Sequence, residues 1–239
     1  MIEIKSASIS FGKKNVLQNV SVKSEIMSNT VILGKNGSGK SVLLKIAAGL
    51  LVPDSGEVLF DGKKISSEDY FRANKLSIGY VFQKGGLFDS MNLFDNVAFP
   101  LRRKGLTENE IPDIVLYNLR RVGLEGSEEK FPTELSGGMQ KRAGIARVLA
   151  MKPKVILYDD PAAGLDPVLT DSIADLILEI RETEKTTSLI VTHDMKFAEK
   201  IADEIVLLDS SQIVFYGDKN KFFSLEDPFA HQFVKGEIE

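Results

Sequence analysis

The segment GKNGSGKS, from Gly34 to Ser41, constrains the fold of this chain more than any other feature. It fits the pattern GxxxxGK[ST] and lies between an apolar stretch, TVIL, and a helical pattern, SVLLKIAAG. A strand, a glycine-rich loop and a helix in this order form a phosphate-binding loop, because backbone N–H groups and the positive end of the helix dipole face one anion. An ordinary glycine-rich turn would not need these flanking elements. We therefore expect an α/β fold with a phosphate site.

This loop also assigns two side chains. Lys40 is expected to bridge the β and γ phosphates of a nucleotide, and the Ser41 hydroxyl to bind Mg²⁺. The other expected contacts come from the loop and the residue after it, namely Gly34, Lys35, Asn36, Gly37, Ser38, Gly39 and Val42.

Two adjacent carboxylates, Asp159 and Asp160, follow the apolar run VILY. Like charges side by side need a cation or a proton, and a strand that ends in aspartate typically supplies a metal ligand beside a phosphate loop. We expect Asp159 to help hold Mg²⁺ and Asp160 to orient the water that attacks the γ phosphate. The alternative is that Asp160 only caps the loop before Pro161.

The segment LSGGMQKRAGIARVLA, residues 135–150, provides a second candidate anion site. Ser136, Gly137 and Gly138 stand at the start of a long helical pattern, where N–H groups are free to receive an anion. One nucleotide does not need two such sites in one chain.

Composition limits the size of the core, the partners and the cellular compartment that we expect. The chain has 239 residues, of which 43% are hydrophobic, so it can form one large core. A net charge of −4 argues against nucleic acid as a partner, and zero cysteines fit a reducing compartment. The start, MIEIKSASIS, resembles a first strand rather than a secretory signal, and the apolar window at 43–53 is too short to span a bilayer. We expect a cytoplasmic, soluble protein.

Apolar runs rich in valine and isoleucine alternate with helical patterns. The predicted strands are 30–34, 76–82, 155–159, 188–192, 204–209 and 212–217. Such an alternation favours a mostly parallel sheet that is covered on both faces. Residues 88–150 read instead as helices; one has Ile111, Val115, Leu119 and Val122 on its apolar face and Gly123 as its cap. Pro112 fits the first turn of that helix, but not a helix capped by Thr107.

With these motifs in order, nearly the whole chain resembles the ATP-binding cassette (ABC) family, whose signature LSGGQ appears here as LSGG with Met139 before Gln140. The resemblance implies a single ABC domain over 1–239. Its P-loop NTPase core, similar to RecA, would span 1–87 and 151–217 and carry an antiparallel β subdomain. Residues 88–150 would be the inserted helical subdomain, and 218–239 a tail. ATP and Mg²⁺ would be the cofactors.

Other family positions can be matched one by one. Phe11 resembles the aromatic residue that stacks on adenine, although it could be a core phenylalanine. Gln83 resembles the Q-loop glutamine near Mg²⁺, and His193 the switch histidine that contacts the γ phosphate; a lone histidine after a strand could also be structural. Asp166 matches the D-loop at the interface of a homodimer.

In that dimer, Ser136, Gly137, Gly138 and Gln140 would reach the nucleotide held by the other subunit. Lys35 and Val42 depart from the family pattern without breaking it. Asp160 stands where most of the family has glutamate, which is longer by one bond, about 1.5 Å. We expect slow ATP hydrolysis, because a misplacement of about 1 Å can cost a hundredfold in rate.

The run KGGLFDSMNLFDNVAFPLR after Gln83 and the C-terminal EDPFAHQFVKGEIE resemble the Mla/Mce-type lipid transport subgroup. This resemblance implies separate integral-membrane permease subunits, a possible regulatory subunit, and a peripheral place on the inner membrane. Leu87, Phe88, Met91, Leu93 and Phe94 are candidates for a permease-binding groove, some of them being core instead. Phe229 and Phe233 could dock a partner, or the tail could fold on its own domain. The alternatives are a soluble ABC assembly ATPase and a non-hydrolysing ATP-binding scaffold.

Overall fold

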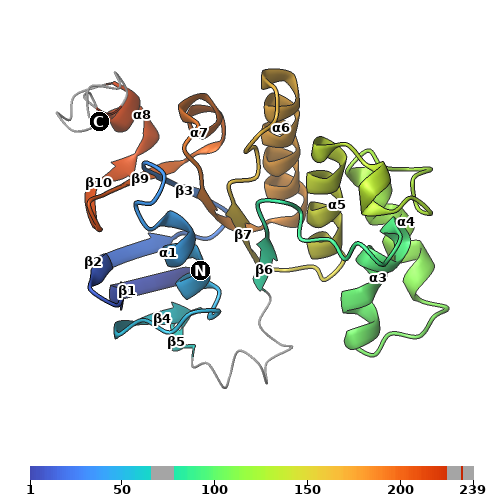
Figure 1. Cartoon of the computed structure of the whole chain (residues 1–239), viewed down its shortest axis with the longest axis horizontal. Coiled ribbons are helices and arrows are strands. Elements are labelled where there is room, and N and C mark those ends of the chain that lie inside the picture. Colours follow the sequence, from blue (N-terminus) through green and yellow to red (C-terminus); the bar gives the residue numbers. More distant parts are fainter. Residues whose placement is uncertain (66–77, 225–232, 234–239) are drawn as a thin grey trace.

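A computed structural model describes residues 1–65, 78–224 and 233. Two sheets and a set of helices make up this part of the chain (Figure 1). The strands are β1 (Ile2–Phe11), β2 (Lys14–Ser24), β3 (Asn29–Leu33), β4 (Ser55–Phe60), β5 (Lys63–Lys64), β6 (Ile78–Val81), β7 (Val155–Asp159), β8 (Thr187–Val191), β9 (Glu204–Asp209) and β10 (Gln212–Asp218). The helices are α1 (Lys40–Ala47), α3 (Leu93–Arg103), α4 (Ile111–Arg121), α5 (Gly137–Leu149), α6 (Pro167–Glu184), α7 (Met195–Ile201) and α8 (Lys219–Phe223), with a 3₁₀ turn at Pro132–Glu134.

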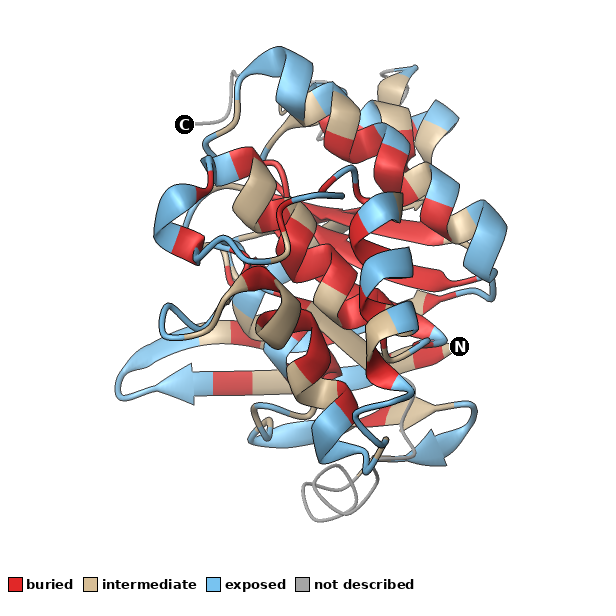
Figure 2. Cartoon of the chain, turned by 90° about the vertical axis from the view of Figure 1, so that its right-hand side faces the viewer, coloured by how far each residue is buried: buried red, intermediate tan, exposed pale blue. Residues whose placement is uncertain are grey.

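The larger sheet has the order β10-β9-β3-β8-β7-β6 and is parallel except for β10. All residues of β3, β7 and β8 are buried, which explains the apolar runs 31–33, 155–158 and 189–191 within them. Leu157 of β7 faces α1 and the small sheet, whereas its neighbour Tyr158 faces the cluster that includes α5, α6 and α7. The sheet is thus covered on both faces, as the sequence predicted (Figure 2).

The smaller sheet is antiparallel and has the order β2-β1-β4-β5. Its buried side chains form one apolar cluster with those of α1, so this sheet and α1 pack on the same side of the larger sheet. The first strand was apparent in the sequence, but β4, in which only Val58 is fully buried, and β5, which has two residues, were not among the predicted strands.

Helices are the regular elements of residues 88–150, and α3, α4 and α5 lie together at one end of the molecule (Figure 1). Helix α4 begins at Ile111 with Pro112 in its first turn, and Gly123 follows its end with φ +71°. Both features agree with the sequence pattern. Thr107 is not the cap of this helix, since it lies outside it and bonds to Glu110.

Two expectations fall on residues that the structure does not describe. Residues 76 and 77 of the predicted strand 76–82, and Phe229 of the tail, lie outside the described residues. Phe233 is half-buried and packs against the main apolar cluster. Among the described residues, no helix combines the length and the apolar character that crossing a bilayer requires.

Candidate active site

The phosphate loop connects the end of β3 with the start of α1. Gly37 and Gly39 have φ values of +82° and +106°, which residues other than glycine rarely adopt. At Gly34 a β-carbon would come within 2.3 Å of the carbonyl oxygen of Leu208, so only glycine fits there. These three positions explain why the loop needs glycine at this spacing.

Lys40 folds back over the loop. Its Nζ donates hydrogen bonds of 2.7 Å to the carbonyl oxygens of both Gly34 and Lys35. Burial lowers the pKa of Lys40, and this effect exceeds the opposite effect of the negative charges of Asp160 and Asp159, which raise it. A buried ammonium with neutral partners favours an anion next to it, because a phosphate would offset the cost of its desolvation.

Asp159 at the end of β7 is held on both oxygens. Ser41 Oγ donates to Oδ1 over 2.7 Å, and the Tyr80 hydroxyl donates to Oδ2 over 2.8 Å. Burial, followed by the charge of Asp159, raises the pKa of Tyr80 well above its usual range, so the phenol remains a donor.

A hydroxyl and a carboxylate side by side are oxygen ligands of the kind that Mg²⁺ prefers. Among the described residues, no cluster of three or more histidine, cysteine or acidic side chains could hold a metal by itself. Ser41 and Asp159 therefore fit an ion that takes its other ligands from phosphate and water.

Asp160 has φ +47°, an uncommon value for a residue with a side chain. Its Oδ1 accepts a 3.1 Å hydrogen bond from Thr192 Oγ1, and its Oδ2 lies 2.8 Å from His193 Nδ1. The carboxylate thus faces the end of β8, which does not agree with the alternative that it caps the loop before Pro161. The other ring nitrogen of His193, Nε2, has no hydrogen-bond partner within the described residues and is available to a ligand.

A cavity of about 320 Å³ brings most of the predicted residues together. Its lining consists of Phe11, Lys14, Val16, Asn36, Gly37, Gly39, Lys40, Ser41, Val42, Gln83, Asp159, Asp160 and Val191. Phe11 is 52% exposed, so the core alternative for this residue is wrong. Sequence reasoning missed Lys14 and Val16; their only signal was proximity to Phe11 across a two-residue turn.

The second predicted anion site lies elsewhere. Ser136 caps α5 by accepting a hydrogen bond from the Met139 N–H, and Asp166 caps α6 in the same way. Neither residue lines the cavity of the phosphate loop. The Gln140 side chain turns back and donates to the carbonyl oxygens of Pro132 and Leu135, at 2.9 and 3.3 Å.

Gln83 lies between the two predicted sites. It lines the phosphate-loop cavity and also a second cavity of about 320 Å³ that includes Gly137 and Gln140. Its carbonyl oxygen accepts a hydrogen bond from Lys141 Nζ at 3.0 Å, and burial lowers the pKa of that lysine. Gln83 is therefore tied to α5 through its backbone while its side chain stays exposed.

Comparisons with known proteins agree with this geometry. The family model described as ABC transporter matches residues 17–163. The "Probable ribonucleotide transport ATP-binding protein mkl" of Mycobacterium leprae is 42% identical over 98% of this chain and 69% of its own length. The "Intermembrane phospholipid transport system ATP-binding protein MlaF" of Haemophilus influenzae is 37% identical over 100% of this chain and 92% of its own.

A solved structure gives the same picture. The dimeric post-hydrolysis state of the ATP-binding cassette MJ0796, bound to ADP and Pi, superposes with a TM-score of 0.83 at 30% identity. The match covers 92% of this chain and 99% of that one.

Proposed function

This chain belongs to the ABC transporter family, and we propose that it is the ATP-hydrolysing subunit of a transporter that moves lipid between the membranes of a bacterial envelope. The observation that carries its ATPase activity is the convergence of Lys40, Ser41, Asp159 and Asp160 on one cavity. The fold puts a phosphate cradle, a metal-binding pair and a candidate base next to one another.

Each residue has a distinct role in the proposed reaction. The loop amides and Lys40 bind the β and γ phosphates, and Ser41 and Asp159 would hold Mg²⁺. When bound, that ion supplies positive charge to the phosphate oxygens. Asp160, fixed by Thr192 and His193, orients the attacking water and accepts its proton. His193 Nε2 is then free to bond to the γ phosphate.

The signature residues act on a second copy of the chain. Ser136 and Asp166 are exposed and do not line the phosphate-loop cavity of their own subunit. Val168, two residues after Asp166, is apolar and 78% exposed, as expected for an interface. ATP held by Lys40 of one subunit would meet Ser136 to Gly138 of the other, so closure of the homodimer would depend on the γ phosphate.

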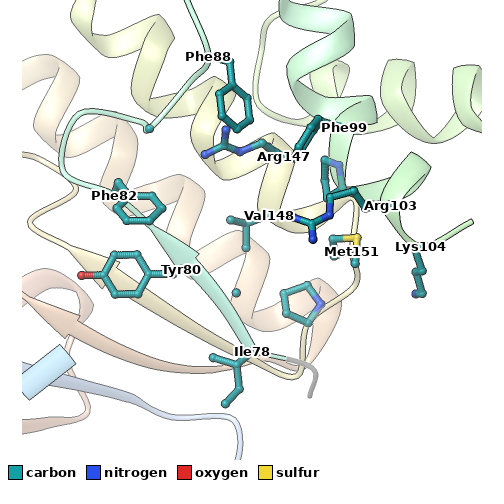
Figure 3. Close-up of a pocket in the computed structure, with 14 residues that line it drawn as sticks. Ile78, Tyr80, Phe82, Phe88, Phe99, Arg103, Lys104, Arg147, Val148 and Met151 are labelled. Atoms are coloured by element: carbon teal, nitrogen blue, oxygen red, sulfur yellow. The ribbon is translucent and has the colours of Figure 1, made fainter. Parts of the chain in front are cut away.

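An aromatic groove of about 710 Å³ is the surface that we assign to the permease (Figure 3). It lies between β6, α3 and α5 and is lined by Phe82, Phe88, Phe99, Val148 and Met151 among others. Arg103, Lys104 and Arg147 add positive charge. We infer that it holds a short cytoplasmic helix of a permease subunit, with an apolar face and at least one acidic residue.

The structure sorts the five residues proposed for this groove. Phe88 lines it and is 42% exposed, whereas Leu93 is fully buried and is one of the core residues expected among the five. Leu87 and Phe94 pack partly against the core, and Met91 is half-buried outside the lining.

Lipid as the substrate rests on the relative named for intermembrane phospholipid transport and on the sequence run after Gln83. A ribonucleotide is the second candidate, because the mycobacterial relative is named for its transport. A permease partner would place the chain on the cytoplasmic face of the inner membrane, with only indirect contact to lipid. A regulatory subunit remains part of the proposal.

Purification of the intact complex from membranes tests this assignment. Mass spectrometry should identify a permease chain and a co-purified phospholipid, and lipid should alter the rate of phosphate release. A ribonucleotide bound in place of lipid, in addition to the ATP or ADP of the phosphate-loop cavity, would favour the second candidate. Recovery of the ATPase without any membrane protein would contradict the proposal.

A further inference from the structure

Tyr80 connects the phosphate-loop cavity with the aromatic groove. It lies on β6, the edge strand of the larger sheet, and lines the groove. Its ring packs beside Phe82, with 4.6 Å between ring centroids. Figure 3 shows the hydroxyl directed away from Val148 and Met151, so the ring and the oxygen of one side chain face two different sites.

The oxygen end of Tyr80 bonds to the carboxylate beside the phosphate loop. Asp159 is 9% exposed and accepts from Ser41 on one oxygen and from Tyr80 on the other. Two donors on opposite oxygens fix the rotation of the carboxylate about its Cβ–Cγ bond. Such partners of a metal ligand set both its orientation and its basicity.

The ring end faces the surface where a partner is expected. Phe82 and Phe88 of the same groove are each 42% exposed, so a helix docked there would cover their rings and contact Tyr80. A change in the tilt of the Tyr80 ring moves its hydroxyl, and hence the donor to Asp159. No other side chain of the groove lining forms a hydrogen bond to Asp159 within the described residues.

We propose that Tyr80 is a positioning residue: it orients the metal-binding carboxylate of Asp159 and reports the occupancy of the groove to it. This inference rests on the proposed function, because it takes ATP with Mg²⁺ as the ligand of the cavity. Three side chains, those of Tyr80, Asp159 and Ser41, would then connect the permease helix to the metal site.

The chain offers a matched control. Tyr158 is on the neighbouring strand, directly before Asp159, and its fully buried hydroxyl has no hydrogen-bond partner within the described residues. Tyr80→Phe and Tyr158→Phe remove the same atom one strand apart. Only the first removes a bond to Asp159.

The first experiment measures Mn²⁺ binding by electron paramagnetic resonance, in the full-length protein with a non-hydrolysable ATP analogue. Tyr80→Phe should weaken Mn²⁺ affinity about tenfold, while metal-free nucleotide affinity stays unchanged and Tyr158→Phe matches the wild type. Asp159→Asn should lose most of the affinity. If Tyr80→Phe binds Mn²⁺ like the wild type while Asp159→Asn does not, the role of Tyr80 is refuted and the proposed function stands. If Asp159→Asn also binds normally, the proposed metal site itself is wrong.

The second experiment tests the link to the groove in the assembled transporter. Tyr80→Phe retains the ring and should co-purify with the permease, whereas Tyr80→Ala should lose both metal affinity and part of the permease. Docking of Tyr80→Ala at the wild-type level would overturn the reporting role.

Discussion

The phosphate-loop cavity and the aromatic groove are built on different principles, although only one side chain separates them. In the cavity, Lys40, Asp159 and Asp160 already have hydrogen-bond partners within the chain. In the groove, the contacts involve aromatic rings. The ring centroids of Phe88 and Phe99 are 4.9 Å apart, and the Arg147 guanidinium lies over the Phe88 ring. The cavity is organised before its ligand arrives, whereas the groove leaves parts of its aromatic rings exposed, which a docked partner would bury.

This contrast predicts that changes in the cavity alter turnover, and that changes in the groove alter assembly. The largest effect is expected at Asp160. Asp160→Asn should lower ATP turnover by about a hundredfold or more, because general bases contribute roughly 10² to 10⁴ in rate. Asp160→Glu should turn over at least as fast as the wild type. Steady-state phosphate release measures both; equal rates for aspartate and asparagine would remove Asp160 from catalysis.

The groove should respond in the opposite way. Phe88→Asp places a carboxylate beside Arg147 and should reduce permease affinity by about thirtyfold, as for a central interface residue worth about 2 kcal/mol. Basal ATPase should stay within about twofold of wild type, because Phe88 touches no group of the cavity. Phe131→Asp is the matched control, since Phe131 is equally exposed but lies outside the groove. Co-purification and phosphate release distinguish loss of docking from misfolding.

A smaller effect is expected at Thr192, which is fully buried and donates to Asp160. Thr192→Val keeps the shape and removes the hydroxyl. We expect kcat to fall about tenfold with little change in KM, in line with a lost hydrogen bond to a charged group of roughly 1.5 kcal/mol. Thr192→Ser should restore the rate; a rise in KM alone would show that Thr192 acts on binding instead.

The smallest effect is expected at Phe11. Loss of a stacking ring should raise KM for ATP about fivefold in Phe11→Ala, since stacking on a base is worth about 1 kcal/mol or slightly more. Phe11→Tyr keeps the ring and should behave like the wild type. Thermal stability should be unchanged because the ring is half exposed. An unchanged KM would mean that adenine is held by other groups.

The sequence is most informative where a local pattern carries the chemistry. The glycines from Gly34 to Gly39 lie within one short loop, and this local spacing predicts the phosphate loop. Asp159 directly follows its apolar run, and this local pattern predicts the metal carboxylate. The fold class followed from the alternation of strands and helices, and it is confirmed by the two-sided sheet.

The remaining features depend on packing across strands, which no local pattern contains. The bond from Tyr80 to Asp159 joins residues 79 positions apart. The Gln140 side chain turns back to the carbonyl oxygen of Pro132, which lies in the 3₁₀ turn before α5. Strand β4 has one buried residue and β5 has only two residues in all, so neither shows a clear pattern. The groove likewise needs α3 and α5 to be placed against β6.

The central claim is that ATP binds between two copies of the chain, and cysteine crosslinking tests it most directly. The sequence has no cysteine, so Ser38→Cys with Gly137→Cys introduces the only thiols. A β-carbon at Gly137 meets no atom within 4 Å. In an Asp160→Asn background, ATP should produce a disulfide-linked dimer and ADP should produce far less. Absence of the crosslinked dimer with ATP would contradict the account.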